Sequence, residues 1–193
     1  VVPYVAGEQP KSANKIKLNT NECPYPPAPG VQELTGKLDS NALRLYPDSN
    51  TTMLVEALAE YYHVKPGQVF VGVGSDDVIS MAYMTFFNGD KPILFPDVTY
   101  SFYDVWANLH RVPFKTCALT EDWHINPADY RQPNGGIIFP NPNAPTGVLE
   151  SLEVVEEIIQ ANRDVVVIVD EAYIDFGGVS ALPLVEKYDN LLV

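Results

Sequence analysis

Short runs of apolar residues alternate with amphipathic helical segments from residue 69 onward, and this alternation restricts the fold more than any other feature. The strongest run, Val165–Val169, consists of five β-branched residues. Strands that are apolar throughout are typical of a parallel sheet covered on both faces by helices. The sequence therefore predicts an α/β fold, a three-layer α/β/α arrangement with a mostly parallel sheet. The predicted strands are residues 69–71, 92–95, 112–117, 136–139, 165–169 and 190–193, and the predicted helices are 31–38, 53–61, 76–87, 99–108 and 151–161.

The first 47 residues differ from the rest of the chain. They contain seven of the 17 prolines and show little periodicity. Because proline fixes φ and lacks an amide hydrogen, a segment such as 24–30 (PYPPAPG) must be extended or turning. We therefore expect residues 1–47 to form an extended arm that belongs partly to a small domain, and residues 48–193 to form the first part of a large domain.

Composition excludes several functions. The chain has 12 basic and 25 acidic residues, a net charge of −13, which argues against binding to duplex nucleic acid. The longest strongly apolar run has five residues, whereas a membrane span needs roughly 20. No secretory signal is visible, and the two cysteines form no CxxC pair, so a cytoplasmic location without disulfides is expected. Isolated histidines predict no metal site.

Polar and aromatic residues follow the predicted strands. Parallel sheets bind ligands outside the carboxyl ends of their strands, so these segments are the expected site. They are Gly74–Asp76, Pro96–Tyr100, Asn141–Asn143 and Asp170–Tyr173.

Two nucleotide-binding interpretations fail on missing residues. A GxGxxG fingerprint would need glycine at position 77, where Asp77 stands. Asp170 could belong to a Walker B strand, but the chain has no GxxxxGK[ST] loop. The segment 141–147 (NPNAPTG) contains two prolines, which favours a rigid loop with one cis X-Pro bond.

Six motifs occur together in a fixed order: LNTNECPYPP (18–27), RLYPD (44–48), GVGSDD (72–77), FPDVTYSFY (95–103), NPNAPTG (141–147) and VDEAYIDF (169–176). This ordered set resembles the first half of the histidinol-phosphate aminotransferases, pyridoxal-phosphate enzymes with the aspartate-aminotransferase fold. The resemblance covers the chain from about residue 15 onward.

The resemblance implies roles for individual residues. Asp170 would face the pyridine nitrogen of pyridoxal 5'-phosphate, and Tyr173 would donate to its phenolic oxygen. The further implied positions are the phosphate cradle Gly74, Ser75 and Asp76; the stacking Tyr100; a second donor, Asn143; Tyr46, which reaches the cofactor of a partner subunit; and the substrate-side Asn21 and Tyr25. Ala144 stands where NNPTG is commoner, so Asn143 or a neighbour could be the donor.

The same resemblance implies a reaction and an assembly. The reaction is transamination between histidinol phosphate or imidazole-acetol phosphate and glutamate or 2-oxoglutarate, in histidine biosynthesis, by a homodimer. The Schiff-base lysine is expected in an SxSK context after the strand at 190–193, so this chain would be an inactive amino-terminal portion. The alternatives are a relative acting on aromatic amino acids or phosphothreonine, and a noncatalytic module that binds phosphate ligands.

Overall fold

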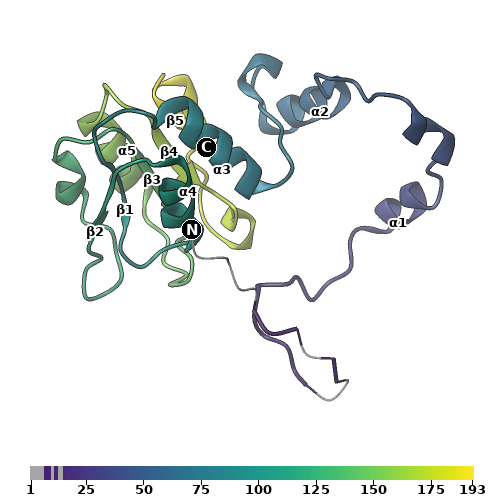
Figure 1. The fold of residues 1–193 in the computed structure, drawn as a ribbon, viewed down its shortest axis with the longest axis horizontal. Helices are drawn as coiled ribbons and strands as arrows, with labels where there is room; N and C mark the ends of the chain where they lie inside the picture. Colours follow the sequence, from purple (N-terminus) through teal and green to yellow (C-terminus); the bar gives the residue numbers. More distant parts are fainter. Residues whose placement is uncertain (1–6, 10, 13–14) are drawn as a thin grey trace. The chain divides into compact units, whose positions relative to one another are not determined.

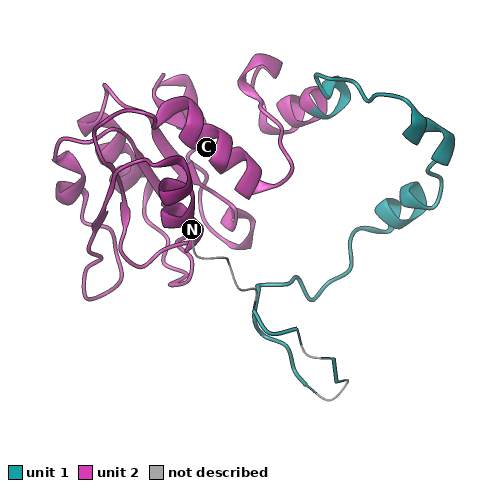
Figure 2. Ribbon diagram, viewed as in Figure 1, with its two compact units in different colours: residues 1–54 teal, residues 55–193 magenta. Residues whose placement is uncertain are grey.

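The computed structural model describes residues 7–9, 11–12 and 15–193 (Figure 1). The chain divides into two compact units, residues 1–54 and residues 55–193 (Figure 2). Residues 1–6, 10, 13 and 14 of the expected arm lie outside the described residues. The domain boundary that we expect after residue 47 stays a prediction.

The helices in the first part of the chain begin at residues that favour a helix start. Helix α1 (Pro29–Thr35) has proline in its first turn, where a missing amide hydrogen costs nothing. It begins two residues before the predicted start. Helix α2 (Thr52–Tyr62) follows Asp48, whose carboxylate accepts the amide hydrogens of Asn50 and Thr52 at 3.0 and 2.8 Å. Asp48 therefore caps the start of α2.

The second unit contains one sheet of five strands, all parallel, in the order β2-β1-β3-β4-β5. The strands are β1 (Ile93–Pro96), β2 (Phe114–Cys117), β3 (Ile137–Pro140), β4 (Val167–Asp170) and β5 (Leu191–Leu192). Helix α3 (Ser75–Phe86) precedes β1, α4 (Phe102–His110) connects β1 to β2, and α5 (Leu152–Ala161) connects β3 to β4. Short 3-10 helices cover Ser40–Arg44, Pro66–Gln68, Pro127–Arg131, Ile174–Phe176 and Leu182–Glu186.

The two faces of the sheet are covered by different helices. Ile93 and Phe95 of β1 pack in one apolar cluster with side chains of α3 and α4. Leu94, between them in sequence, belongs to a second cluster that contains Val155, Ile158 and Ile159 of α5. Successive strand residues point to opposite faces, so continuous apolar strands fill both clusters. The predicted three-layer α/β/α arrangement is confirmed.

One predicted strand is wrong. Residues 69–71 form no strand, and the Phe70 side chain is 66% exposed. The run has the β-branched and aromatic composition of a strand, but a strand requires a neighbour to satisfy its amides and carbonyls. Among the described residues no strand pairs with it. The prediction was wrong because it rested on the composition of the segment alone.

Helix α3 is fixed against the sheet at its carboxyl end. Phe87, the residue after the helix, is buried against Gly136, which immediately precedes β3. A Cβ atom built at Gly136 would collide with the Phe87 ring, and the Gly136 φ of +149° also disfavours other residues. Glycine at 136 therefore allows α3 to lie directly on the backbone of the sheet.

Candidate functional site

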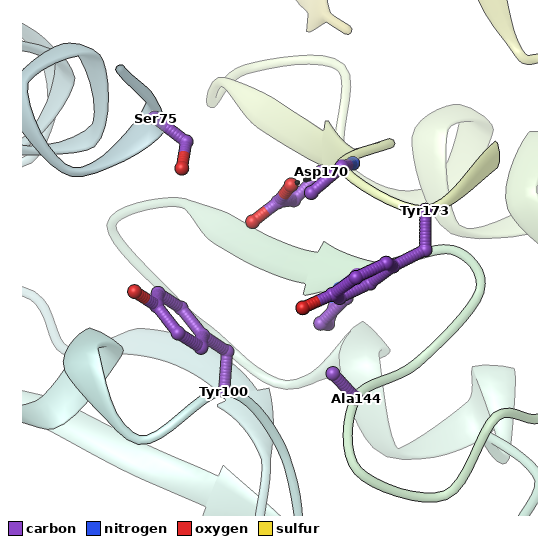
Figure 3. A pocket seen from close by; sticks show the side chains of 7 residues that line it. Ser75, Tyr100, Ala144, Asp170 and Tyr173 are labelled. Atoms are coloured by element: carbon purple, nitrogen blue, oxygen red, sulfur yellow. Dashed lines mark hydrogen bonds between the residues drawn. The ribbon is translucent and has the colours of Figure 1, made fainter. Parts of the chain in front are cut away.

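A pocket lies beyond the carboxyl ends of the central strands (Figure 3). Strands β3 and β4 end at the same level, because Pro140 pairs with Asp170. Residues from four segments therefore meet at this edge. The lining residues are Ser75 of α3, Tyr100 before α4, Pro140 and Ala144 at and after the end of β3, and Asp170, Ala172 and Tyr173 at the end of β4 and in the turn that follows.

Asp170, the last residue of β4, places its carboxylate at the pocket with both oxygens bonded. The Tyr103 hydroxyl donates to Oδ2 at 2.8 Å, and the Ala172 amide donates to Oδ1 at 3.1 Å. A carboxylate can accept about four hydrogen bonds, so Asp170 retains capacity for a donor in the pocket. The carboxylate is thus held in place and still able to bind a ligand.

Tyr100 forms the opposite wall of the pocket (Figure 3). Its ring stacks on that of Phe102, with 5.6 Å between centroids and planes 19° apart. Its hydroxyl donates to Asp76 Oδ1 at 3.0 Å. Burial, and then the hydrogen bond to Asp76, raise the pKa of the Tyr100 phenol far above its ordinary value. The phenol therefore stays protonated, and its ring is held in one plane.

The first turn of α3 supplies Ser75 to the pocket. Gly74 before it has a φ of +84°, a conformation that glycine adopts without strain, and serves as the N-cap. Asp77 Oδ2 accepts the Val73 amide hydrogen at 3.0 Å, which closes the turn. Amides at a helix start attract anions, so this turn can present Ser75 and backbone donors to a phosphate.

Asn143 is buried beside the pocket, and its side chain is occupied by the protein. Its Nδ2 donates to the Val98 carbonyl and to Thr146 Oγ1, both at 3.0 Å, while its Oδ1 accepts from Thr99 Oγ1 at 3.0 Å. Both amide hydrogens are therefore used within the loops. Ala144, the next residue, lines the pocket with a methyl group instead. The contacts favour a positioning role for Asn143 over donation to a ligand.

The loop that carries Asn143 is held at both ends. The bonds Asn141–Pro142 and Ala144–Pro145 are both cis, so the expected cis bond is present and a second accompanies it. The Asn141 side chain exchanges two hydrogen bonds with the backbone of Glu150. The buried Glu150 carboxylate in turn accepts the Ile125 amide hydrogen at 2.7 Å. These contacts fix the loop as a rigid unit.

The turn after β4 is held by a second carboxylate. Glu171 accepts hydrogen bonds from Ser180 Oγ and from the Ala181 amide, both at 2.6 Å. Partial burial raises the pKa of Glu171, while these two hydrogen bonds oppose that shift. Because Glu171 ties the turn to residues 180–181, Tyr173 is presented to the pocket, where Figure 3 shows its hydroxyl.

The structure brings four of the sequence-predicted site residues to one pocket: Ser75, Tyr100, Asp170 and Tyr173. Gly74, Asp76 and Asn143 lie next to these residues without lining it. Asn21, Tyr25 and Tyr46 belong to residues 1–54, the unit that the structure describes by itself, so their roles stay predictions.

Sequence reasoning missed Tyr103, although it ends the FPDVTYSFY motif. Tyr103 lies three residues after Tyr100, and residues at this spacing share a helix face, which was a usable signal. Nothing in the sequence indicated its contact with Asp170, because that partner is 67 residues away.

Residues 7–9, 11–12 and 15–193 contain no cluster of three or more potential metal ligands, and Cys23 and Cys117 are unpaired thiols. No helix in this described part is long and apolar enough to cross a membrane.

Comparisons with known proteins agree on one family. The sequence model of aminotransferase class I and II matches residues 13–193. Histidinol-phosphate aminotransferases of Pseudomonas putida (strain F1) and Lactococcus lactis subsp. cremoris (strain SK11) are 58% and 52% identical over the whole of this chain. The chain spans about half the length of these curated relatives, 56% and 54%.

Solved structures show the same fold. A crystal structure of histidinol-phosphate aminotransferase from Sinorhizobium meliloti, in complex with pyridoxal-5'-phosphate, superposes with a TM-score of 0.76 at 22% identity. The match covers 86% of this chain and 47% of that one.

Proposed function

We propose that the pocket holds pyridoxal 5'-phosphate, because the chain belongs to the class I and II aminotransferase family. The observation that carries this proposal is the Asp170 carboxylate, fixed at the pocket edge between Tyr100 and Tyr173. A relative's structure that contains this cofactor supports the same assignment.

The donor set of the pocket fits this cofactor. A flat heterocycle needs an aromatic wall, which Tyr100 provides. A protonated ring nitrogen needs an anionic acceptor, and Asp170 retains lone pairs for it. A phenolic oxygen and a phosphate need donors, which are the Tyr173 hydroxyl and Ser75 at the start of α3.

Each of these side chains has one task in the proposed reaction. When bound, pyridoxal phosphate supplies a conjugated ring that accepts electrons as a substrate C–H bond breaks. Asp170 would accept a hydrogen bond from the protonated ring nitrogen and keep that proton in place. Tyr173 donates its hydroxyl hydrogen to the ring oxygen, and Tyr100 restricts the ring to one plane. Ser75 and the amides of its turn bind the phosphate group.

We further propose that the protein containing this chain transaminates histidinol phosphate or imidazole-acetol phosphate with glutamate or 2-oxoglutarate, in histidine biosynthesis. The names of relatives 52–58% identical over the whole chain support this substrate. Asn21 and Tyr25 are the proposed substrate-side residues. A homodimer in the cytoplasm is proposed with it, with Tyr46 reaching the cofactor of the partner subunit.

No lysine is among the residues that line the described pocket. Lys187, which follows the last 3-10 helix, is ion-paired with Glu156 and stacks over the Tyr188 ring. We therefore propose that the 193-residue chain binds the cofactor without a covalent bond and has little transaminase activity by itself.

Titration of the 193-residue chain with pyridoxal phosphate tests this assignment. Asp170→Asn should weaken binding by roughly tenfold or more, because a hydrogen bond with a charged partner is lost. Asp175→Asn is the matched control: it makes the same charge change in the exposed 3-10 helix after Tyr173 and should bind like the unmodified chain. Equal affinity of all three proteins would refute the assignment.

Borohydride reduction and mass spectrometry test the proposed absence of a covalent bond. Free aldehyde should be reduced without stoichiometric addition of the cofactor to the protein. One cofactor per chain on a single lysine, or rapid turnover of histidinol phosphate, would show that the lysine lies within these residues.

A further inference from the structure

We propose that Tyr103 is a positioning residue that sets the orientation of the Asp170 carboxylate at the pocket. The effect of Tyr103 on the orientation of the Asp170 carboxylate does not depend on the proposed function. Its consequence for cofactor binding does rest on that proposal. Tyr103 does not line the pocket, so it acts through Asp170 and not by contact with a ligand.

The orientation of the Asp170 carboxylate depends on its two donors. The terminal torsion of an aspartate is broad, so the carboxylate plane has little intrinsic preference. The Tyr103 hydroxyl holds Oδ2 at 2.8 Å, and the Ala172 amide holds Oδ1 at 3.1 Å. Two donors on different oxygens define a plane, whereas one donor would leave the carboxylate free to turn.

Tyr103 is a fixed donor because its ring is packed on several sides. The side chain is fully buried, with the Phe95 and Tyr100 rings edge-on at 5.9 and 5.6 Å between centroids. The Tyr83 hydroxyl donates to the Tyr103 carbonyl at 3.2 Å and ties the start of α4 to α3. Both the ring and the backbone of Tyr103 are therefore held.

The Tyr103 hydroxyl remains a donor over a wide pH range. Burial, and then the neighbouring Asp170, raise the pKa of this phenol well above its ordinary value. The proton consequently stays on tyrosine and points at Oδ2. A donor with a packed ring and a raised pKa is suited to hold a carboxylate for a ligand.

Two matched variants separate positioning from packing. Tyr103→Phe and Tyr83→Phe each remove one hydroxyl from a fully buried ring, and each deletes one hydrogen bond, but only the first touches Asp170. Crystal structures of the two variants without cofactor should show the Asp170 carboxylate turned, or in two conformers, in Tyr103→Phe and unchanged in Tyr83→Phe. An Asp170 carboxylate with its original orientation in Tyr103→Phe overturns the inference.

Cofactor binding gives the second measurement. Pyridoxal phosphate should bind about tenfold more weakly to Tyr103→Phe, with an altered pH dependence of the bound absorption band, and within about twofold of normal to Tyr83→Phe. Equal weakening by both variants indicates lost packing and overturns the inference. If the unmodified chain binds no cofactor while the Asp170 carboxylate still turns in Tyr103→Phe, the proposed function fails and the positioning role stands.

Discussion

The Tyr100 hydroxyl and the Asp76 carboxylate are joined by a 3.0 Å hydrogen bond between the segment before α4 and the first turn of α3. A second tyrosine, Tyr103 of α4, donates to Asp170 of β4. Two tyrosines three residues apart thus tie α4 and the segment before it to carboxylates of α3 and β4, and the pocket lies among them.

The proposed contribution of Tyr100 to cofactor binding is made by its ring. Tyr100→Phe keeps the ring and removes only the bond to Asp76, so pyridoxal phosphate affinity should fall by no more than about threefold. Tyr100→Ala removes the aromatic wall and should weaken affinity by about tenfold or more. Fluorescence titration measures both. If the phenylalanine variant binds as weakly as the alanine variant, the hydroxyl is the important group and the stacking role is wrong.

Position 144 should accept a new donor. Ala144→Asn restores the commoner NNPTG sequence and places an amide where a methyl group now lines the pocket. One added hydrogen bond should tighten pyridoxal phosphate binding by about threefold to tenfold, measured by titration. Ala144→Leu is the control, because leucine has similar bulk without a donor, and it should not improve binding. Improvement by both residues would indicate packing alone.

Substitution of Asn143 should affect the stability of the protein more than its affinity for the cofactor. Asn143→Ala removes a buried side chain and leaves the partly buried Val98 carbonyl without its partner, so it should lower the free energy of unfolding by about 2–3 kcal/mol. Asn108→Ala removes a comparable side-chain bond on the exposed surface of α4 and should change stability by less than about 0.5 kcal/mol. Urea unfolding compares them, and similar values for the two variants would contradict the assigned contacts.

The Glu150 carboxylate should be a second stability determinant. It is buried, holds the Ile125 amide and lies 3.2 Å from His124 Nδ1, so Glu150→Ala should cost about 3 kcal/mol. Glu157→Ala removes the exposed ion pair with Arg131 and should cost less than about 1 kcal/mol. Thermal or urea unfolding measures the difference, and an equal cost would show that burial of Glu150 contributes nothing.

Three buried tyrosines predict alkaline unfolding. Burial, the largest cause in each, raises the pKa of Tyr83, Tyr103 and Tyr130 above the ordinary value of about 10. Above that pH the unfolded chain has lost phenolic protons that the folded chain still holds, so the free energy of unfolding falls as pH rises, and the full contribution is present below about pH 10.

Unfolding in urea from about pH 8 to about pH 11, followed together with phenolate absorbance, measures this alkaline loss. Tyr130→Phe removes one of the three phenols and should reduce the slope of stability against pH. An unchanged slope in that variant would exclude Tyr130 as a contributor.

The fold was largely predictable from the sequence, because strands buried on both faces leave continuous apolar runs such as Val165–Val169. The predicted strand at 69–71 failed because composition reports the propensity of a segment and not the presence of a neighbour for it. Ser75, Tyr100, Asp170 and Tyr173 could be predicted since each follows or lies near the end of a strand or the start of a helix.

Two parts of the site could not be predicted. The role of Asn143 depends on whether its amide hydrogens are already used by Val98 and Thr146, a matter of three-dimensional geometry. The Tyr103–Asp170 bond joins residues 67 positions apart, and no local pattern encodes such a pair. Residues that support a ligand-binding group are generally less visible in sequence than the group itself.

Because Phe87 packs on Gly136, a displacement at this end of α3 would tilt the whole helix. Its far end carries Ser75, and a helix of 12 residues is roughly 18 Å long. Any side chain introduced at position 136 would lift the Phe87 end, and a tilt of a few degrees there would displace the opposite end by roughly an ångström. A substitution remote from the pocket would thereby displace the turn that we propose binds the phosphate, although every residue that lines the pocket stays the same.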